Sequence, residues 1–88
     1  MPAISRFYGI VISMNNSDHP PPHFHARYGE AKASVSVATG LIIEGELPRR
    51  TFRLVHEWWS LHRAELAENW ARFESQQRLL PIAPLVRD

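Results

Sequence analysis

The spacing of apolar residues changes at Pro48, and this change most constrains the fold. Before Pro48, apolar and polar residues alternate in short segments, as in strands whose side chains point to opposite faces of a sheet. After Pro48, apolar residues recur about every 3.6 residues, as on one side of an α-helix. The sequence therefore predicts an α+β fold, a small antiparallel meander followed by one long amphipathic helix packed on its apolar face.

The predicted sheet occupies residues 5–45. Alternation is clear in residues 6–14 (RFYGIVISM), 23–28 (HFHARY) and 31–38 (AKASVSVA), and 41–45 (LIIEG) is a candidate for a short fourth strand. The intervening NNSDHPPP favours a loop, because proline cannot donate to a sheet ladder. We therefore expect three to four strands, with one apolar face and one polar face.

The predicted helix spans residues 48–74. Pro48 suits its first position, where the missing N–H would be unpaired in any case. The apolar residues that share about half of the helix circumference are Leu54, Val55, Trp58, Trp59, Leu61, Leu66, Trp70 and Phe73. We expect Trp58 and Trp59 in the core. The tail, residues 79–88, contains two prolines and is expected to be extended, and residues 1–88 are expected to form a single domain.

Composition excludes several classes of function. Ten basic and nine acidic residues leave a net charge of +1, so any anion site must be local. The chain has no cysteine and hence neither a disulfide nor a thiolate zinc site. No apolar run approaches the ~20 residues of a spanning helix, and MPAISRFYG lacks a signal-peptide pattern. We expect a cytoplasmic protein with no membrane contact and no cofactor.

The segment DHPPPHFHARYGE carries three histidines around three prolines. Alternation places His23, His25 and Arg27 on the face opposite Phe24 and Tyr28. One interpretation is structural: His23 closes the proline loop through backbone hydrogen bonds, and His25 forms a cross-strand pair. The other is half of a divalent-metal site, although no third committed ligand is evident and no metal is expected. The candidate ligands would be Asp18, His19, His23 and His25.

Three polar residues, His62, Glu65 and Asn69, lie within the apolar side of the helix, three and then four residues apart. Because buried polar groups need partners, they predict an internal network that pins the helix to the sheet. Alternatively, they share a cleft with His23 and His25, where Glu65 and a histidine act as base and acid. The candidate catalytic residues are His23, His25, His62 and Glu65. Alternation argues against the shared cleft, because it turns Phe24 toward the helix.

PRRTFR places three arginines in the first turns of the helix, where positive charge opposes the helix dipole. Guanidinium groups beside free N–H groups suit a phosphate. Glu44 and Glu46, just upstream, are positioned in the sequence to neutralise the cluster. The candidate residues for anion or nucleic-acid contact are Arg27, Arg49, Arg50 and Arg53.

Four segments, ISRFYGIVISM, DHPPPHFHARYGE, GELPRR and LHRAELAENW, resemble the bacterial family catalogued as domain of unknown function 4160. The resemblance extends over nearly the whole chain. It implies a bacterial protein whose gene commonly adjoins that of a small protein of the family domain of unknown function 2442, an arrangement similar to toxin–antitoxin modules. It implies no catalytic residues.

We therefore expect a non-enzymatic or weakly enzymatic member of a two-protein module, acting through protein contact and, at its arginines, contact with RNA or DNA. A small meander leaves sheet edges uncovered, which invites strand addition by the partner or homodimerisation. Two alternatives remain open. One is a small ribonuclease-like toxin with histidine acid–base chemistry and arginine-bound phosphate. The other is a divalent-metal binder that uses the His23/His25 strand.

Overall fold

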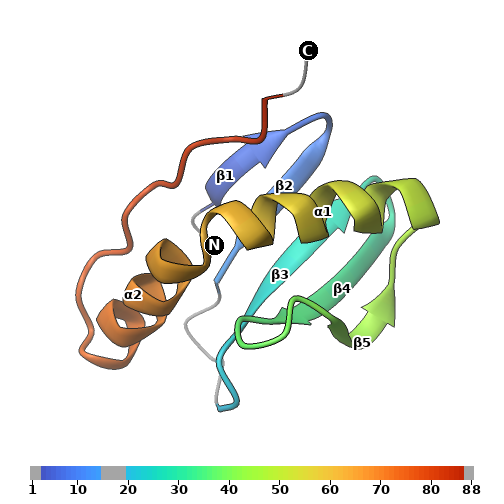
Figure 1. Cartoon of the computed structure of the whole chain (residues 1–88). Coiled ribbons are helices and arrows are strands. Elements are labelled where there is room, and N and C mark those ends of the chain that lie inside the picture. Colours follow the sequence, from blue (N-terminus) through green and yellow to red (C-terminus); the bar gives the residue numbers. More distant parts are fainter. Residues whose placement is uncertain (1–2, 15–19, 87–88) are drawn as a thin grey trace.

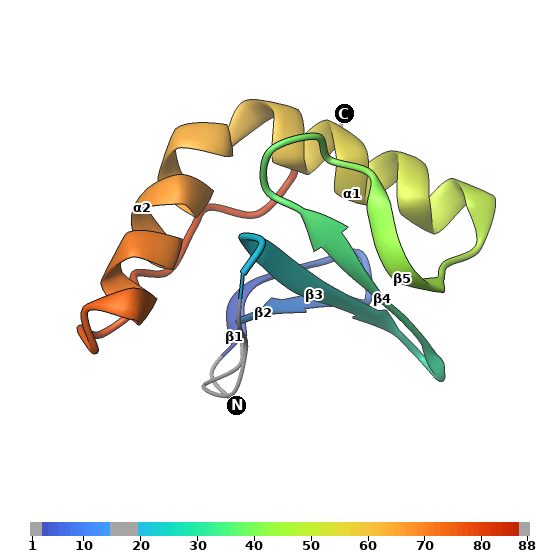
Figure 2. The ribbon, with the colours of Figure 1, turned by 90° about the horizontal axis from the view of Figure 1, so that it is seen from below.

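The computed structural model describes residues 3–14 and 20–86 and confirms the predicted α+β class (Figure 1). One antiparallel sheet has the strands in chain order, β1 to β5, and two helices follow. The strands are β1 (Ala3–Phe7), β2 (Ile10–Ser13), β3 (His23–Tyr28), β4 (Ala31–Ser36) and β5 (Ile42–Glu46), and the helices are α1 (Arg49–Leu61) and α2 (Arg63–Glu74). Figure 2 shows α1 over one face of the sheet and α2 descending at the left, past the end of the strands.

The prediction of three to four strands is wrong in number, because residues 6–14 form a hairpin and not one strand. Tyr8 (φ 51°) and Gly9 (φ 80°) make its turn, and Phe7 pairs with Ile10. Two successive residues with positive φ match the twist of a tight hairpin. The reversal places Phe7 and Ile10 on the same buried face, whereas unbroken alternation would put these residues, three apart, on opposite faces.

The prediction of one long helix is also wrong, since the helix is interrupted at His62 (φ −127°). A straight helix over residues 48–74 would be about 40 Å long. The sheet measures only roughly 20 Å along its strands and across them. The interruption turns α2 away from the direction of α1, so that Leu66 and Trp70 are still buried (Figures 1 and 2). Within the described residues, neither helix has the length and apolarity needed to cross a membrane.

The core lies between α1 and the apolar face of the sheet. Trp58 is fully buried, with its ring centroid 5.5 Å from that of Phe7 and 5.6 Å from that of Phe24. Trp59 is also buried and donates from Nε1 to the carbonyl oxygen of Val37 (2.8 Å). The prediction that Trp58 and Trp59 belong to the core is therefore confirmed.

Residues 77–86 have neither helix nor strand structure and return along the helices toward β1 (Figure 1). The N–H of Ile82 donates to the carbonyl oxygen of Ile4 in β1 (2.7 Å), and the side chains of Ile82 and Leu85 are buried. The tail thus partly covers one edge of the sheet. No strand or tail segment among the described residues pairs with the other edge, β5.

Gly40 permits the close contact between the turn after β4 and α1. Its φ is 71°, and a Cβ at this position would overlap the ring of Trp59. His56 Nδ1 donates to the carbonyl oxygen of Gly40 (2.9 Å). Two residues of α1, His56 and Trp59, therefore contact the turn at Gly40.

We predict that Gly40→Ala lowers the free energy of unfolding in urea by about 2–5 kcal/mol, through left-handed backbone strain and overpacking. Gly29→Ala is the matched control, because Gly29 has φ 59° and nothing within 4 Å of an added Cβ. It should lower the free energy of unfolding by only about 1–2 kcal/mol. Equal losses in the two variants would contradict the packing argument.

Candidate functional site

The histidines of β3 make the contacts expected from their structural interpretation. His23 Nδ1 donates to the carbonyl oxygen of Pro21 (2.7 Å), which closes the proline loop. His25 pairs in register with Ser34, and its Nδ1 lies 3.3 Å from Ser34 Oγ. The two imidazoles meet edge to face at 5.2 Å, and the ring of His23 lies 5.4 Å from that of Trp70 in α2. Both rings therefore have packing or hydrogen-bonding roles.

The metal interpretation gains no support from the described part of the chain. Among residues 3–14 and 20–86, no group of three histidine, aspartate or glutamate side chains is arranged to hold a metal ion. Asp18 and His19, the further candidate ligands, lie outside the described residues. A metal site that includes them remains a prediction.

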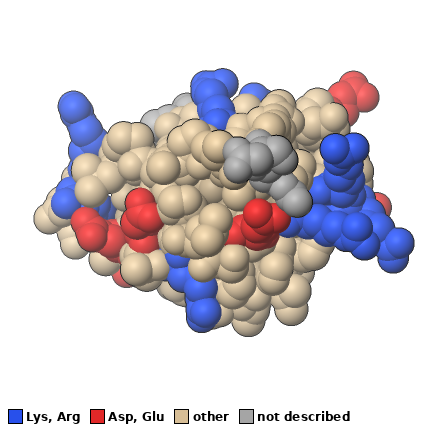
Figure 3. Space-filling model, turned by 45° about the horizontal axis from the view of Figure 1, so that its top comes forward, with Lys and Arg blue, Asp and Glu red and all other residues tan. Residues whose placement is uncertain are grey.

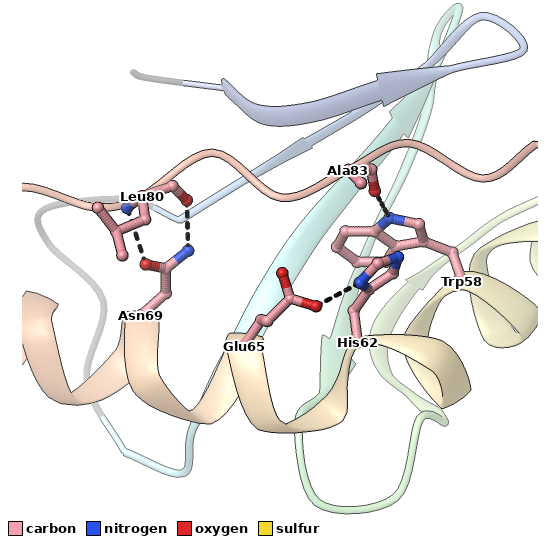
Figure 4. Close-up of polar contacts among 6 residues, drawn as sticks. All are labelled: Trp58, His62, Glu65, Asn69, Leu80 and Ala83. Carbon is pink, nitrogen blue, oxygen red and sulfur yellow. Dashed lines mark hydrogen bonds and ion pairs between the residues drawn. The ribbon is translucent and has the colours of Figure 1, made fainter.

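The polar residues of the helices face the C-terminal tail (Figure 4). Asn69 is almost completely buried and forms two hydrogen bonds with the Leu80 backbone, Nδ2 to oxygen at 2.8 Å and N–H to Oδ1 at 2.9 Å. His62 Nδ1 donates to Glu65 Oε1 (2.6 Å) and its ring packs on that of Trp58. The prediction of a network that pins the helix to the sheet needs correction, because Asn69 pins α2 to the tail.

The described contacts do not assemble the predicted shared cleft. Within the part of the chain that the structure describes, no hydrogen bond or ring contact joins His62 or Glu65 to His23 or His25. Glu65 lies in the first turn of α2, where its charge is favourable to the helix dipole, and about half of its side chain is exposed. The pair therefore has a structural explanation at the start of α2.

The arginines at the start of α1 are exposed, as a surface role requires. Arg49, Arg50 and Arg53 follow Pro48, which is the N-cap and not the first helical residue. The first turn has no acidic residue, and no ion pair with Glu44 or Glu46 is present among the described residues. Figure 3 shows Lys and Arg atoms gathered toward the side of the molecule on which α1 begins.

Arg27, the fourth candidate for anion contact, belongs to a different surface, the sheet face that the helices leave uncovered. An open hollow of about 710 Å³ lies on this face. The polar and charged side chains that line this hollow are those of Arg6, Ser13, His25, Arg27, Lys32, Ser34 and Glu44. Arg27 therefore does not belong with the arginines of α1. Arg6 and Lys32 lie with Arg27 on the open face of the sheet.

Sequence analysis missed Arg6 and Lys32 as site residues for different reasons. The two-residue turn at Gly29 and Glu30 places Arg27 directly opposite Lys32, a pairing that the sequence pattern could have indicated. The position of Arg6 depends on the hairpin turn at Tyr8 and Gly9, which brings β1 beside β2. The only residue in the sequence that indicates this turn is Gly9.

These features define a small α+β domain with a half-covered antiparallel sheet and a polar, cationic open face. The chain belongs to the family described as Domain of unknown function (DUF4160), whose sequence profile matches residues 9–71. The resemblance drawn from the sequence is thereby confirmed. The searches of curated proteins and of solved structures gave no match.

We predict that Asn69→Ala lowers the free energy of unfolding by about 2 kcal/mol, because two hydrogen bonds to the tail are lost at a buried site. Hydrogen exchange at the Ile82 amide should accelerate, since the tail holds this amide against β1. Glu65→Gln serves as the control and should cost less than about 1 kcal/mol, as expected for an exposed pair. Unchanged exchange at Ile82 in Asn69→Ala would refute the role of Asn69 in holding the tail.

Proposed function

We propose that this protein is one member of a two-protein, toxin–antitoxin-like bacterial module and acts by binding its partner along strand β5. The observation that carries the proposal is the asymmetry of the sheet edges. The tail bonds to β1 at Ile4, whereas β5 has β4 on one side and no strand on the other among the described residues. An unpaired edge offers backbone N–H and C=O groups to an added strand.

The side chains of β5 favour a selective partner over indiscriminate pairing. Ile43 is half exposed and offers apolar contact area, while Glu44 and Glu46 are exposed on the same strand. Edge charges discourage self-association, and a partner strand with cationic side chains would complement them. A family 2442 protein encoded by an adjacent gene is the partner that the family resemblance implies. The same edge would form the interface of a homodimer.

Contact with RNA or DNA is the second element of the proposed function. Exposed arginines occur at the start of α1 and on the open sheet face, which supports local anion contact despite the net charge of +1. An antitoxin-like or toxin-like protein that binds both a partner and a nucleic acid needs two separate surfaces. The backbone edge of β5 and the open face are two such surfaces, and they adjoin at Glu44.

The catalytic alternative has weaker geometric support. A ribonuclease-like mechanism needs an acid and a base near one phosphate. His62 and Glu65 bond to one another beside the tail, whereas His23 and His25 bond to the proline loop and to Ser34. The adjacent rings of His23 and His25 are the one observation that favours catalysis on the open face.

We predict that the wild-type chain copurifies with the adjacent gene product and that Ile43→Lys reduces the affinity at least about tenfold, because a lysine on an edge strand opposes strand addition. Leu61→Lys is the matched control, since Leu61 is an exposed aliphatic residue at the end of α1. It should bind like the wild type. Light scattering on the chain alone tests the homodimer through the same variants. Equal binding by Ile43→Lys and wild type would exclude β5 as the interface.

A further inference from the structure

The C-terminal tail repeats its contacts with the rest of the protein every three residues. Leu79 packs against the core while partly buried, and Ile82 and Leu85 are 5% and 4% exposed. A strand would alternate its faces every two residues, whereas a polyproline II helix has three residues per turn. The spacing of the buried side chains therefore indicates polyproline II geometry for residues 79–86.

The backbone of the tail has the same period. The carbonyl oxygen of Leu80 accepts a hydrogen bond from Asn69 Nδ2 (2.8 Å). The carbonyl oxygen of Ala83 accepts one from Trp58 Nε1 (2.9 Å). Figure 4 shows both carbonyl groups turned toward the helices. Two groups three residues apart thus point the same way, as successive turns of a polyproline II helix require.

Two prolines restrict this part of the tail to an extended conformation. Pro81 and Pro84 fix their own φ at about −65°, and each disfavours helical geometry at the residue before it, Leu80 or Ala83. The hydrogen bonds to the helices hold the segment in place. A partner therefore meets a segment that is already ordered, which lowers the entropy cost of binding.

The outward side of the tail consists of two exposed ridges, each with one residue in three. One ridge carries Arg78, Pro81 and Pro84, and the other carries Leu80, Ala83 and Val86. Members of a ridge follow one another at about 9 Å, because a polyproline II helix rises about 3.1 Å per residue. The outward side thus presents two pairs of an aliphatic residue and a proline, with an arginine before them.

These ridges fit a groove lined by aromatic side chains. Such grooves recognise extended segments with the spacing P-x-x-P, which Pro81 and Pro84 have in this chain. The guanidinium of Arg78, on the proline ridge, suits a carboxylate beside the groove. Strand addition fits this segment less well, because proline has no N–H for a ladder and the N–H of Ile82 already donates to Ile4.

We propose that the outward side of the tail binds a partner domain that has an aromatic-lined groove with an acidic end. The two aliphatic–proline pairs fill the groove, and Arg78 pairs with the acidic end. The tail meets the β1 edge of the sheet, whereas β5 is the opposite edge. The inference therefore goes beyond the proposed function and does not depend on partner binding at β5.

The test is an NMR titration of the isotope-labelled protein with a panel of purified SH3, WW and EVH1 domains, which present such grooves. We expect at least one of these domains to bind saturably and to shift resonances chiefly in residues 78–86. Pro81→Ala/Pro84→Ala should weaken this binding at least about tenfold, since both prolines lie at the centre of the contact. Arg78→Gln should weaken it and reduce its dependence on salt.

The matched control is Pro21→Ala/Pro22→Ala, which removes two exposed prolines from the loop before β3. It should bind like the wild type. Hydrogen exchange at the Ile82 amide in Pro81→Ala/Pro84→Ala should stay close to the wild-type rate, which shows that the tail still contacts β1 and that the loss of binding comes from the ridges.

Three outcomes would overturn the inference. They are an absence of saturable binding to every domain of the panel, equal losses in the two proline variants, and resonance shifts confined to residues outside 78–86. Ile43→Lys should bind the panel like the wild type, because β5 lies at the other edge of the sheet. Failure at the tail would therefore leave the copurification result for β5 unaffected, and failure at β5 would leave the tail result unaffected.

Discussion

The fully buried side chain of Trp58 is the contact on which the rest of the structure depends. Its ring packs on Phe7 of β1, Phe24 of β3 and His62 at the interruption between the helices. Its Nε1 donates to the carbonyl oxygen of Ala83 in the tail (2.9 Å). One residue thus joins the sheet, the helices and the tail, because a bulky aromatic side chain with one polar atom can fill a core and still bind backbone.

Among the described residues, this arrangement covers one face of the sheet more than the other. The helices bury the apolar face and the tail meets β1, whereas no described segment pairs with β5. The two uncovered surfaces differ in chemistry. The open face concentrates Arg6, Arg27 and Lys32, whereas β5 presents the half-exposed Ile43 together with Glu44 and Glu46. The two surfaces adjoin at Glu44, which belongs to β5 and also lines the hollow on the open face.

Much of the histidine strand was predictable, because strand alternation and register are local properties. Alternation correctly separates His23 and His25 from Phe24, and both structural contacts expected of the histidines are present. The polar residues of the helix were harder to interpret. Periodicity places Asn69 on the buried side but does not specify its partner, and the Leu80 backbone is eleven residues away in an irregular tail.

The sequence by itself determined the fold class, the buried faces of β2, β3 and β4 and the place of the tryptophans, since these follow from hydrophobic periodicity. Tertiary structure decided the reversal at Tyr8 and Gly9, the interruption at His62 and the alignment of Arg6 with Arg27. The physical reason is that these features depend on the size of the sheet and on which strands become neighbours. Such features depend on residues far apart in the sequence, so they produce no periodic pattern of apolar residues.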